Sequence, residues 1–230
     1  MAIATAQSPD SRSHQATDRS VRNRTAELPN RELIEKTTPK ASITMKIACL
    51  GWGSLVWDPG ELPVRGKWQT NGPFLPIEFV RQSQDGRITL VITDGAVGIP
   101  VLWAALESTS LHDGREALAK REKVKTKNFE RSIAAWSSDF STNHTEVEPV
   151  AAWAKEVGID GVVWTSLKPR FSNVLRTASC EEVLRYLANL TGEAKVRAEK
   201  YIRRAPSQIR TPYRGEIERR LGWTPLVLTT

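Results

Sequence analysis

The chain is poor in the residues that hold metals or build disulfide scaffolds. It has two cysteines, Cys49 and Cys180, too few for a set of disulfides or a four-cysteine zinc site. Its three histidines, His14, His112 and His144, show no metal-ligand spacing, and none is paired with a cysteine in a ligand motif. We therefore expect no bound metal.

Long apolar segments are also absent. No uninterrupted apolar run could cross a membrane as a helix, so we expect no membrane partner. Residues 1–44 lack the apolar core of a secretory signal, which favours a cytoplasmic protein. The net charge of +7 is compatible with anionic partners but does not require them.

Residues 1–44 differ in composition from the rest of the chain. They contain no glycine, no aromatic residue and few large aliphatic residues. Such a stretch cannot bury enough apolar surface to offset the entropy lost on ordering, so we predict a disordered N-terminal extension. Met45-Lys46-Ile47 is typical of a natural start that runs into a strand. Residues 45–230 are expected to form a single domain.

The first half of this domain is rich in strand patterns. Alternating residues and short apolar runs predict strands at 46–50, 76–82, 87–93, 100–106 and 161–165. Asp85-Gly86 predicts a hairpin between the second and third of these. Residues 129–136 fit a strand and a helix equally well.

Helix start signals dominate the second half. Helices are predicted over 110–124 from Ser110, over 180–189 from a capping box at Ser179, over 192–204, and from Thr211-Pro212 to Leu221. Strands followed by helices favour an α+β fold with one mostly antiparallel, curved sheet and a helical C-terminal part over 178–230.

The segment Gly51-Trp52-Gly53-Ser54-Leu55 follows the first predicted strand directly. Two glycines around one residue let the backbone turn sharply, and successive amides in such a turn can bind an anion or a developing oxyanion. A plain tight turn explains the same residues. The loop does not match a dinucleotide-binding motif, because the third glycine and a following helix are missing. The position of Trp52 in this loop suggests that its side chain faces the site.

Glu122 is the second candidate for chemistry. Leu118 and Glu122 follow Leu111 by seven and eleven positions, which places each of them within roughly 20° of Leu111 on one helix face. A carboxylate on an apolar face is costly unless it has partners, and burial raises its pKa towards the range of a general acid or base. Alternatively, Glu122 lies at the helix end, where it reaches solvent or pairs with an arginine.

These motifs resemble a known family. Gly-Trp-Gly-Ser-Leu-Val-Trp at 51–57 is similar to the Tyr-Gly-Ser-Leu-Ile/Met-Trp loop of γ-glutamylcyclotransferases, especially the glutathione-specific, ChaC-type branch. Ala119-Lys120-Arg121-Glu122-Lys123 resembles the Tyr-Arg-Glu-Lys segment that carries the catalytic glutamate of that branch. The resemblance covers roughly residues 46–165. The sequence differs at Trp52, where the family has tyrosine, and at 124–126, where Val-Lys-Thr replaces Gly-Gly-Tyr.

The resemblance implies a mixed β-barrel with surrounding helices, a helical C-terminal cap and a cofactor-independent enzyme. The α-amine of a γ-glutamyl compound would attack its own side-chain carbonyl, form 5-oxoproline and release an amine. Glu122 would be the catalytic acid–base, and Gly51, Trp52, Gly53, Ser54 and Leu55 would bind the substrate. The differences from the family leave open whether glutathione, another γ-glutamyl compound or no compound at all is turned over.

Two further residues and one loop are candidates for a place at the site. Arg81 closes a predicted strand and is a candidate for binding an anionic substrate, although a solvated strand end explains it equally simply. Cys49 precedes the glycine loop, but no histidine is evidently placed to activate it, so we interpret it as a buried strand residue. Lys168-Pro169-Arg170-Phe171 is a candidate loop at the rim of a pocket.

Two rival functions remain beside the enzyme. One is a non-catalytic module that binds a small molecule or a protein on the same fold. The other is a nucleic-acid-binding accessory protein, suggested by a basic segment at 195–220 with nine lysines and arginines against three glutamates. Because these charges interleave with apolar residues at helical spacing, we favour the solvated face of a packed cap and do not expect a nucleic-acid partner. The oligomeric state is left open.

Overall fold

A computed structural model describes residues 45–226 of the chain. The predicted N-terminal extension, 1–44, and the last four residues of the predicted helical part lie outside these residues. No helix within 45–226 has the length and apolar character needed to cross a membrane.

The described strands form two sheets. The first has the order β2-β6-β1-β8-β7, with β2 at Val64–Gln69, β6 at Leu102–Leu106, β1 at Ile47–Gly51, β8 at Gly161–Thr165 and β7 at Ile133–Ser137. The second has the order β4-β3-β5, with β4 at Ile88–Ile92, β3 at Phe74–Gln82 and β5 at Gly98–Pro100. All neighbouring strands are antiparallel except β1 and β8, which run parallel.

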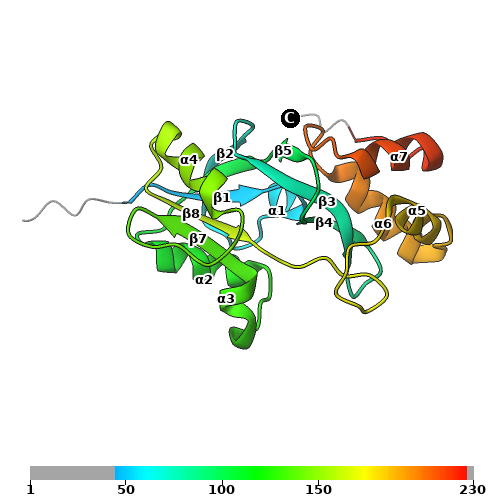
Figure 1. Cartoon of the computed structure of the whole chain (residues 1–230), viewed down its shortest axis with the longest axis horizontal. Coiled ribbons are helices and arrows are strands. Elements are labelled where there is room, and N and C mark those ends of the chain that lie inside the picture. The colour runs from blue at the N-terminus through cyan, green and yellow to red at the C-terminus, as the bar shows by residue number, and fades with distance from the viewer. Residues whose placement is uncertain (1–44, 227–230) are drawn as a thin grey trace, which may run out of the picture. The chain divides into compact units, whose positions relative to one another are not determined.

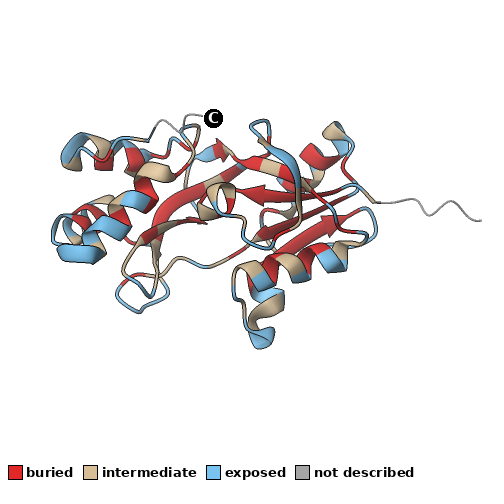
Figure 2. Cartoon of the chain, turned by 180° about the vertical axis from the view of Figure 1, so that it is seen from behind, coloured by how far each residue is buried: buried red, intermediate tan, exposed pale blue. Residues whose placement is uncertain are grey.

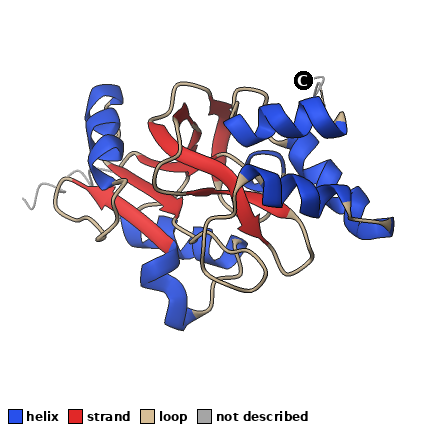
Figure 3. Cartoon of the chain, turned by 45° about the vertical axis from the view of Figure 1, so that its right-hand side comes forward, coloured by secondary structure: helices blue, strands red, loops and turns tan. Residues whose placement is uncertain are grey.

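Seven α-helices accompany the sheets in the described residues. They are α1 (Ser54–Trp57), α2 (Leu111–Arg121), α3 (Phe129–Ser132), α4 (Val147–Val157), α5 (Cys180–Ala188), α6 (Gly192–Arg204) and α7 (Pro212–Leu221), with a short 3-10 turn at Thr126–Asn128. Figure 1 shows α5, α6 and α7 grouped beside the β3–β4 hairpin, and Figure 3 shows helices flanking the strands.

The α+β class is confirmed, but the predicted single curved sheet is wrong. The strand pairing within 45–226 gives two sheets and no closed barrel. The predicted strand at 100–106 breaks at Val101, where the chain leaves the second sheet and enters the first. There Val101 donates its amide to the carbonyl of Pro73 and accepts from the amide of Gly72. A Cβ at Gly72 would lie 2.3 Å from the Val101 oxygen, so this crossing requires glycine.

The local predictions agree closely with the structure. The β3–β4 hairpin is present, and Ser110, Ser179 and Thr211 each accept a hydrogen bond from a first-turn amide as helix N-caps. Ser179 forms the predicted capping box with Glu182. The ambiguous segment 129–136 is half helix and half strand, since α3 ends where β7 begins. Helix α4 and strand β2 were not predicted.

The core lies on both faces of the first sheet. In β1, Ile47 and Cys49 pack with residues of α2, whereas Ala48 and Leu50 pack towards the second sheet and the C-terminal helices. Because both faces are covered, β1 is buried along its whole length instead of alternating. Figure 2 shows most of the central strands buried and the outer faces of the helices exposed, whereas β2 is largely exposed.

A buried carboxylate joins the C-terminal helices to the second sheet. Glu78 of β3 is 4% exposed, and one of its oxygens accepts from the Thr211 hydroxyl at 2.5 Å and the Phe79 amide at 2.7 Å. The other accepts from the amide of Tyr213, in the first turn of α7, at 3.1 Å. Burial raises the pKa of Glu78, while these three hydrogen bonds oppose the rise. The Glu78 side chain of β3 thus accepts hydrogen bonds from the N-terminal end of α7.

We expect Glu78→Ala to lower the free energy of unfolding by about 2 kcal/mol, because it leaves buried donors at the start of α7 without their acceptor. Urea denaturation measures the change. Glu107→Ala, at an exposed residue after β6, is the matched control and should unfold at the wild-type urea concentration. Equal midpoints for the two variants would contradict this role of Glu78.

Candidate functional site

A cavity of about 180 Å³ opens where the end of β1 meets the second sheet and helix α6. Its wall comes from five separate parts of the chain: the segment 50–55, the β3–β4 hairpin, Glu122, the residues after β8, and Tyr201. The structure therefore brings together all the candidate residues named from the sequence, Gly51 to Leu55, Arg81 and Glu122, in one cavity.

The glycine loop leads from β1 directly into α1. A single helical turn does follow the glycines, contrary to expectation, but four residues are too few for a dinucleotide-binding helix. Both glycines are required by close packing: a Cβ at Gly51 would lie 2.7 Å from the Trp68 ring, and one at Gly53 would lie 2.5 Å from the Tyr201 hydroxyl.

The loop presents backbone donors to the cavity. The amides of Gly53, Ser54 and Leu55 donate to no carbonyl or side chain within residues 45–226. All three residues line the cavity. An oxyanion or carboxylate bound there would satisfy amides that the fold leaves without partners.

Trp52 does not face the site as expected. Its side chain is 5% exposed, belongs to the core, and donates its indole N–H to the carbonyl of Leu90 at 3.2 Å. A large aromatic ring gains more from burial than from exposure, provided that its N–H finds an acceptor. Trp52 thus fastens the loop to β4.

Glu122 is the C-cap of α2, and the helix ends there because Lys123 takes a positive φ of 53°. The amides of Lys123 and Val124 bond back to the carbonyls of Lys120 and Ala119, the pattern of a Schellman motif. This ending turns the Glu122 carboxylate to the cavity, with its side chain 19% exposed. Glu122 is therefore at the helix end and paired with an arginine, yet also at the cavity.

Arg121 joins Glu122 to the loop. It forms an ion pair with the Oε1 of Glu122 at 2.5 Å, and its other nitrogens donate to the Ser54 hydroxyl at 3.3 Å and the Asp58 carbonyl. The Oε2 of Glu122 accepts no hydrogen bond from the described residues. One carboxylate oxygen is thus held in place by Arg121, while the other has no partner among residues 45–226.

Cys49 is the buried strand residue that the sequence indicated. It is fully buried in β1, and burial, followed by the nearby charge of Glu122, raises the pKa of its thiol far above the usual range. A thiol held neutral in this way is no nucleophile.

Tyr201 of α6 is a site residue that sequence reasoning missed. Its hydroxyl accepts from the amide of Leu90 at 3.4 Å, and its ring packs edge-on against Trp57. Burial raises the pKa of Tyr201 to about 12, so the phenol keeps its proton at neutral pH and remains a hydrogen-bond donor. The helical spacing of Ala198, Tyr201 and Ile202 marks a buried face, but nothing local indicates that this face meets residue 53.

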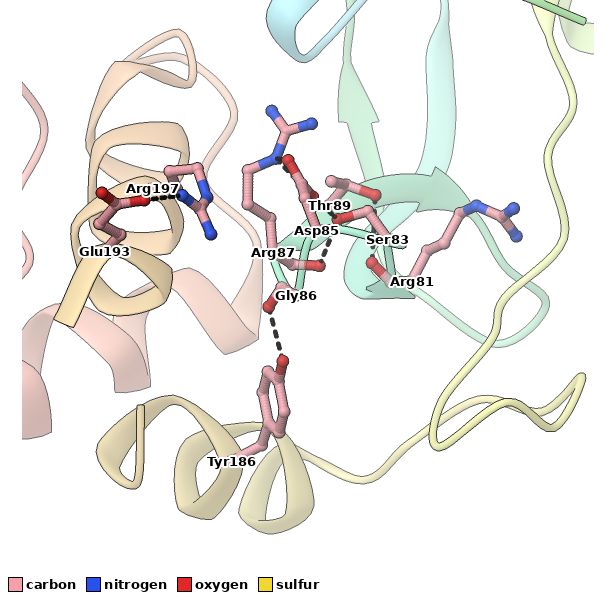
Figure 4. Close-up of polar contacts among 9 residues, drawn as sticks. All are labelled: Arg81, Ser83, Asp85, Gly86, Arg87, Thr89, Tyr186, Glu193 and Arg197. Atoms are coloured by element: carbon pink, nitrogen blue, oxygen red, sulfur yellow. Dashed lines mark hydrogen bonds and ion pairs between the residues drawn. The ribbon is translucent and has the colours of Figure 1, made fainter. Parts of the chain in front are cut away.

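The β3–β4 hairpin supplies positive charge. Arg81 and Arg87 line the cavity with Ser83 and Thr89, and Figure 4 shows these side chains on the strands and the turn of the hairpin. Arg81 donates to the carbonyl of Lys168 at 2.5 Å, which places the predicted rim loop against the hairpin. Burial, together with the charge of Arg170, lowers the pKa of Arg81.

The basic segment at 195–220 is largely neutralised. Five of its nine basic residues form ion pairs with glutamates: Arg197, Arg203, Arg214, Arg219 and Arg220. Arg214 is also buried and donates to the carbonyls of Ala205, Pro206 and Ile209. These contacts favour a packed helical cap over a phosphate-binding face.

No protein-family model matches the chain, and no curated protein matches its sequence. Among solved structures, it is similar to a γ-glutamyl cyclotransferase specific to glutathione from yeast, at 13% sequence identity over 80% of this chain and 92% of that chain, with a TM-score of 0.38. A likeness at this level assigns no family.

We expect Gly53→Ala to destabilise the protein by about 1–3 kcal/mol, because the added methyl group meets the Tyr201 hydroxyl. Tyr201→Phe removes that oxygen and should recover part of the loss. Unfolding free energies of the two single variants and the double variant measure the coupling between these residues. Strictly additive effects would show that the loop and α6 do not touch at this point.

Proposed function

We propose that the protein is a γ-glutamylcyclotransferase-like enzyme that cyclises a γ-glutamyl compound to 5-oxoproline and releases an amine. The observation that carries this proposal is the meeting of Glu122 and the 51–55 loop in one cavity. The reaction needs a base at the attacking nitrogen and donors at the carbonyl oxygen, and these two elements supply them.

The proposed reaction is intramolecular. Glu122 takes a proton from the α-ammonium group of the substrate, and the resulting amine attacks the γ-carbonyl carbon. The carbonyl oxygen gains negative charge, which the free amides of Gly53, Ser54 and Leu55 stabilise. The carbon–nitrogen bond of the amide then breaks as Glu122 returns this proton to the leaving nitrogen. The attacking nitrogen loses its second proton, which passes through Glu122 to the same leaving nitrogen, so the amine departs as an ammonium group. No water is consumed, and the carboxylate is regenerated.

Arg121 has a positioning role in this scheme. Because it binds Oε1 of Glu122 and the hydroxyl of Ser54, it fixes the base relative to the loop. A small displacement of a catalytic base is costly, since ring closure depends on the alignment of the reacting atoms. The free Oε2 of Glu122 is then the atom that exchanges the proton.

The cavity also offers a phenol despite the substitution of the loop tyrosine. Trp52 lies in the core, but the Tyr201 hydroxyl comes within contact distance of position 53 from helix α6. A neutral phenol there can donate to the substrate's carboxylate or carbonyl oxygen. The missing Gly-Gly-Tyr segment after Glu122 is replaced by the turn at Lys123 and Val124.

We expect Glu122→Gln to lower the rate of 5-oxoproline release by at least about a hundredfold, because an amide cannot accept the ammonium proton. A panel of γ-glutamyl peptides and amines, assayed for 5-oxoproline, measures this. Glu116→Gln, at an exposed position on the same helix, is the matched control and should retain full activity. Activity that survives in Glu122→Gln would remove this residue from its role.

A non-catalytic binding module is the second candidate. The Arg121–Glu122 ion pair favours it, since a paired carboxylate can serve structure alone. The same panel distinguishes the two functions: a binding module would be protected against thermal unfolding by a γ-glutamyl compound without releasing 5-oxoproline.

A further inference from the structure

A second cavity adjoins the first along the β3–β4 hairpin. It has a volume of about 230 Å³ and is lined by polar residues of the hairpin and of the loop after β8, among them Gln82, Ser83, Arg170 and Asn173. Ser83 lines both cavities, so the two meet at this residue. Arg170 lines the second cavity, beside the hairpin that also lines the first.

The two cavities carry an excess of positive charge. Their lining residues, with the groups paired to them, include four guanidinium groups against two carboxylates: Arg81, Arg87, Arg121 and Arg170 against Asp85 and Glu122. The excess is two positive charges. A γ-glutamyl group with a free ammonium and a free carboxylate is neutral, so it does not balance this excess.

Arg81 and Arg170 have no carboxylate partner within 4.0 Å in the described residues. Each donates one N–H to a neutral acceptor, Arg81 to the Lys168 carbonyl and Arg170 to the Asn173 side chain at 3.0 Å. Their remaining N–H groups are available. The backbones of residues 80–82 and Arg170 are joined by two hydrogen bonds, which hold these like charges near each other. Two such guanidinium groups favour a bound anion between them.

Arg87 is oriented by its neighbours. Its Nε donates to Asp85 at 3.0 Å, its guanidinium lies 5.3 Å from the centre of the Tyr201 ring, and its terminal nitrogens donate to no described residue. Ser83 bonds both Asp85 and the Arg87 carbonyl, and Tyr186 of α5 binds the Gly86 carbonyl at 2.7 Å (Figure 4). The hairpin that presents these charges is thus fixed in position.

From this arrangement we infer that the substrate is a γ-glutamyl compound whose leaving amine carries two carboxylates, that is, an acidic amino acid linked through its amine. One carboxylate binds Arg81 and Arg170 and the other binds Arg87. The γ-glutamyl part of this substrate rests on the proposed function. The acidic leaving amine rests on the excess of positive charge around the two cavities.

The test compares three ligands that differ by one charge each: γ-glutamylglutamate, γ-glutamylalanine and γ-glutamylmethylamide. Calorimetry on the full-length Glu122→Gln chain measures binding without turnover. We expect each carboxylate to tighten binding about tenfold, as for a charge-assisted hydrogen bond, and the difference to shrink as salt is added. Arg170→Gln in the same background should bring γ-glutamylglutamate to the affinity of γ-glutamylalanine.

Arg65→Gln, an exposed arginine on β2, is the matched control and should change none of the three affinities. In the wild-type chain, L-glutamate should protect against thermal unfolding more than L-alanine, a comparison that needs no inactive variant. Equal affinities for the three ligands would overturn the inference even if 5-oxoproline is released. If the binding order holds but the wild-type chain releases no 5-oxoproline, the acidic specificity stands and the proposed reaction falls.

Discussion

The ion pair between Arg121 and Glu122 is the contact on which the candidate site depends. Helix α2 packs on the opposite face of the first sheet from the C-terminal helices, and its end at Glu122 meets the cavity at the C-terminal end of the central strand β1. There Arg121 binds Glu122, the Ser54 hydroxyl and the Asp58 carbonyl together. Without these bonds the carboxylate and the loop amides would be separate features on two elements.

Close packing alone is a sufficient explanation for the two glycines of the 51–55 loop. Gly51 makes room for the Trp68 ring and Gly53 for the Tyr201 hydroxyl, so a side chain at either position would displace an aromatic neighbour even if the loop binds nothing. What packing leaves unexplained is the set of free amides at residues 53–55 and the free Oε2 of Glu122 beside one cavity. Polar groups without partners at a cavity are the features that a bound substrate would satisfy.

Charge is unevenly arranged in the molecule. The C-terminal helices hold many basic residues, but most of these are matched by glutamates at helical spacing or in neighbouring helices. Among the guanidinium groups without a carboxylate partner, those of Arg81 and Arg170 belong to residues whose backbones pair beside the β3–β4 hairpin. The number of basic residues in a segment is therefore a poor guide to a binding surface, because five of the nine in 195–220 form ion pairs with glutamates.

Features that depend on neighbours along the chain could be predicted from the sequence. They include the helix caps at Ser110, Ser179 and Thr211, the β3–β4 hairpin, and the alternative that Glu122 lies at the end of α2 and pairs with an arginine. Helix α4 was missed although its Gly158 ending is visible in the sequence, because its N-cap, Glu146, makes no side-chain cap. The change of sheet at Val101, the burial of Trp52 and the meeting of Gly53 with Tyr201 could not be predicted. Each depends on contacts between segments distant in the chain, whose free energy comes from packing that no local pattern records.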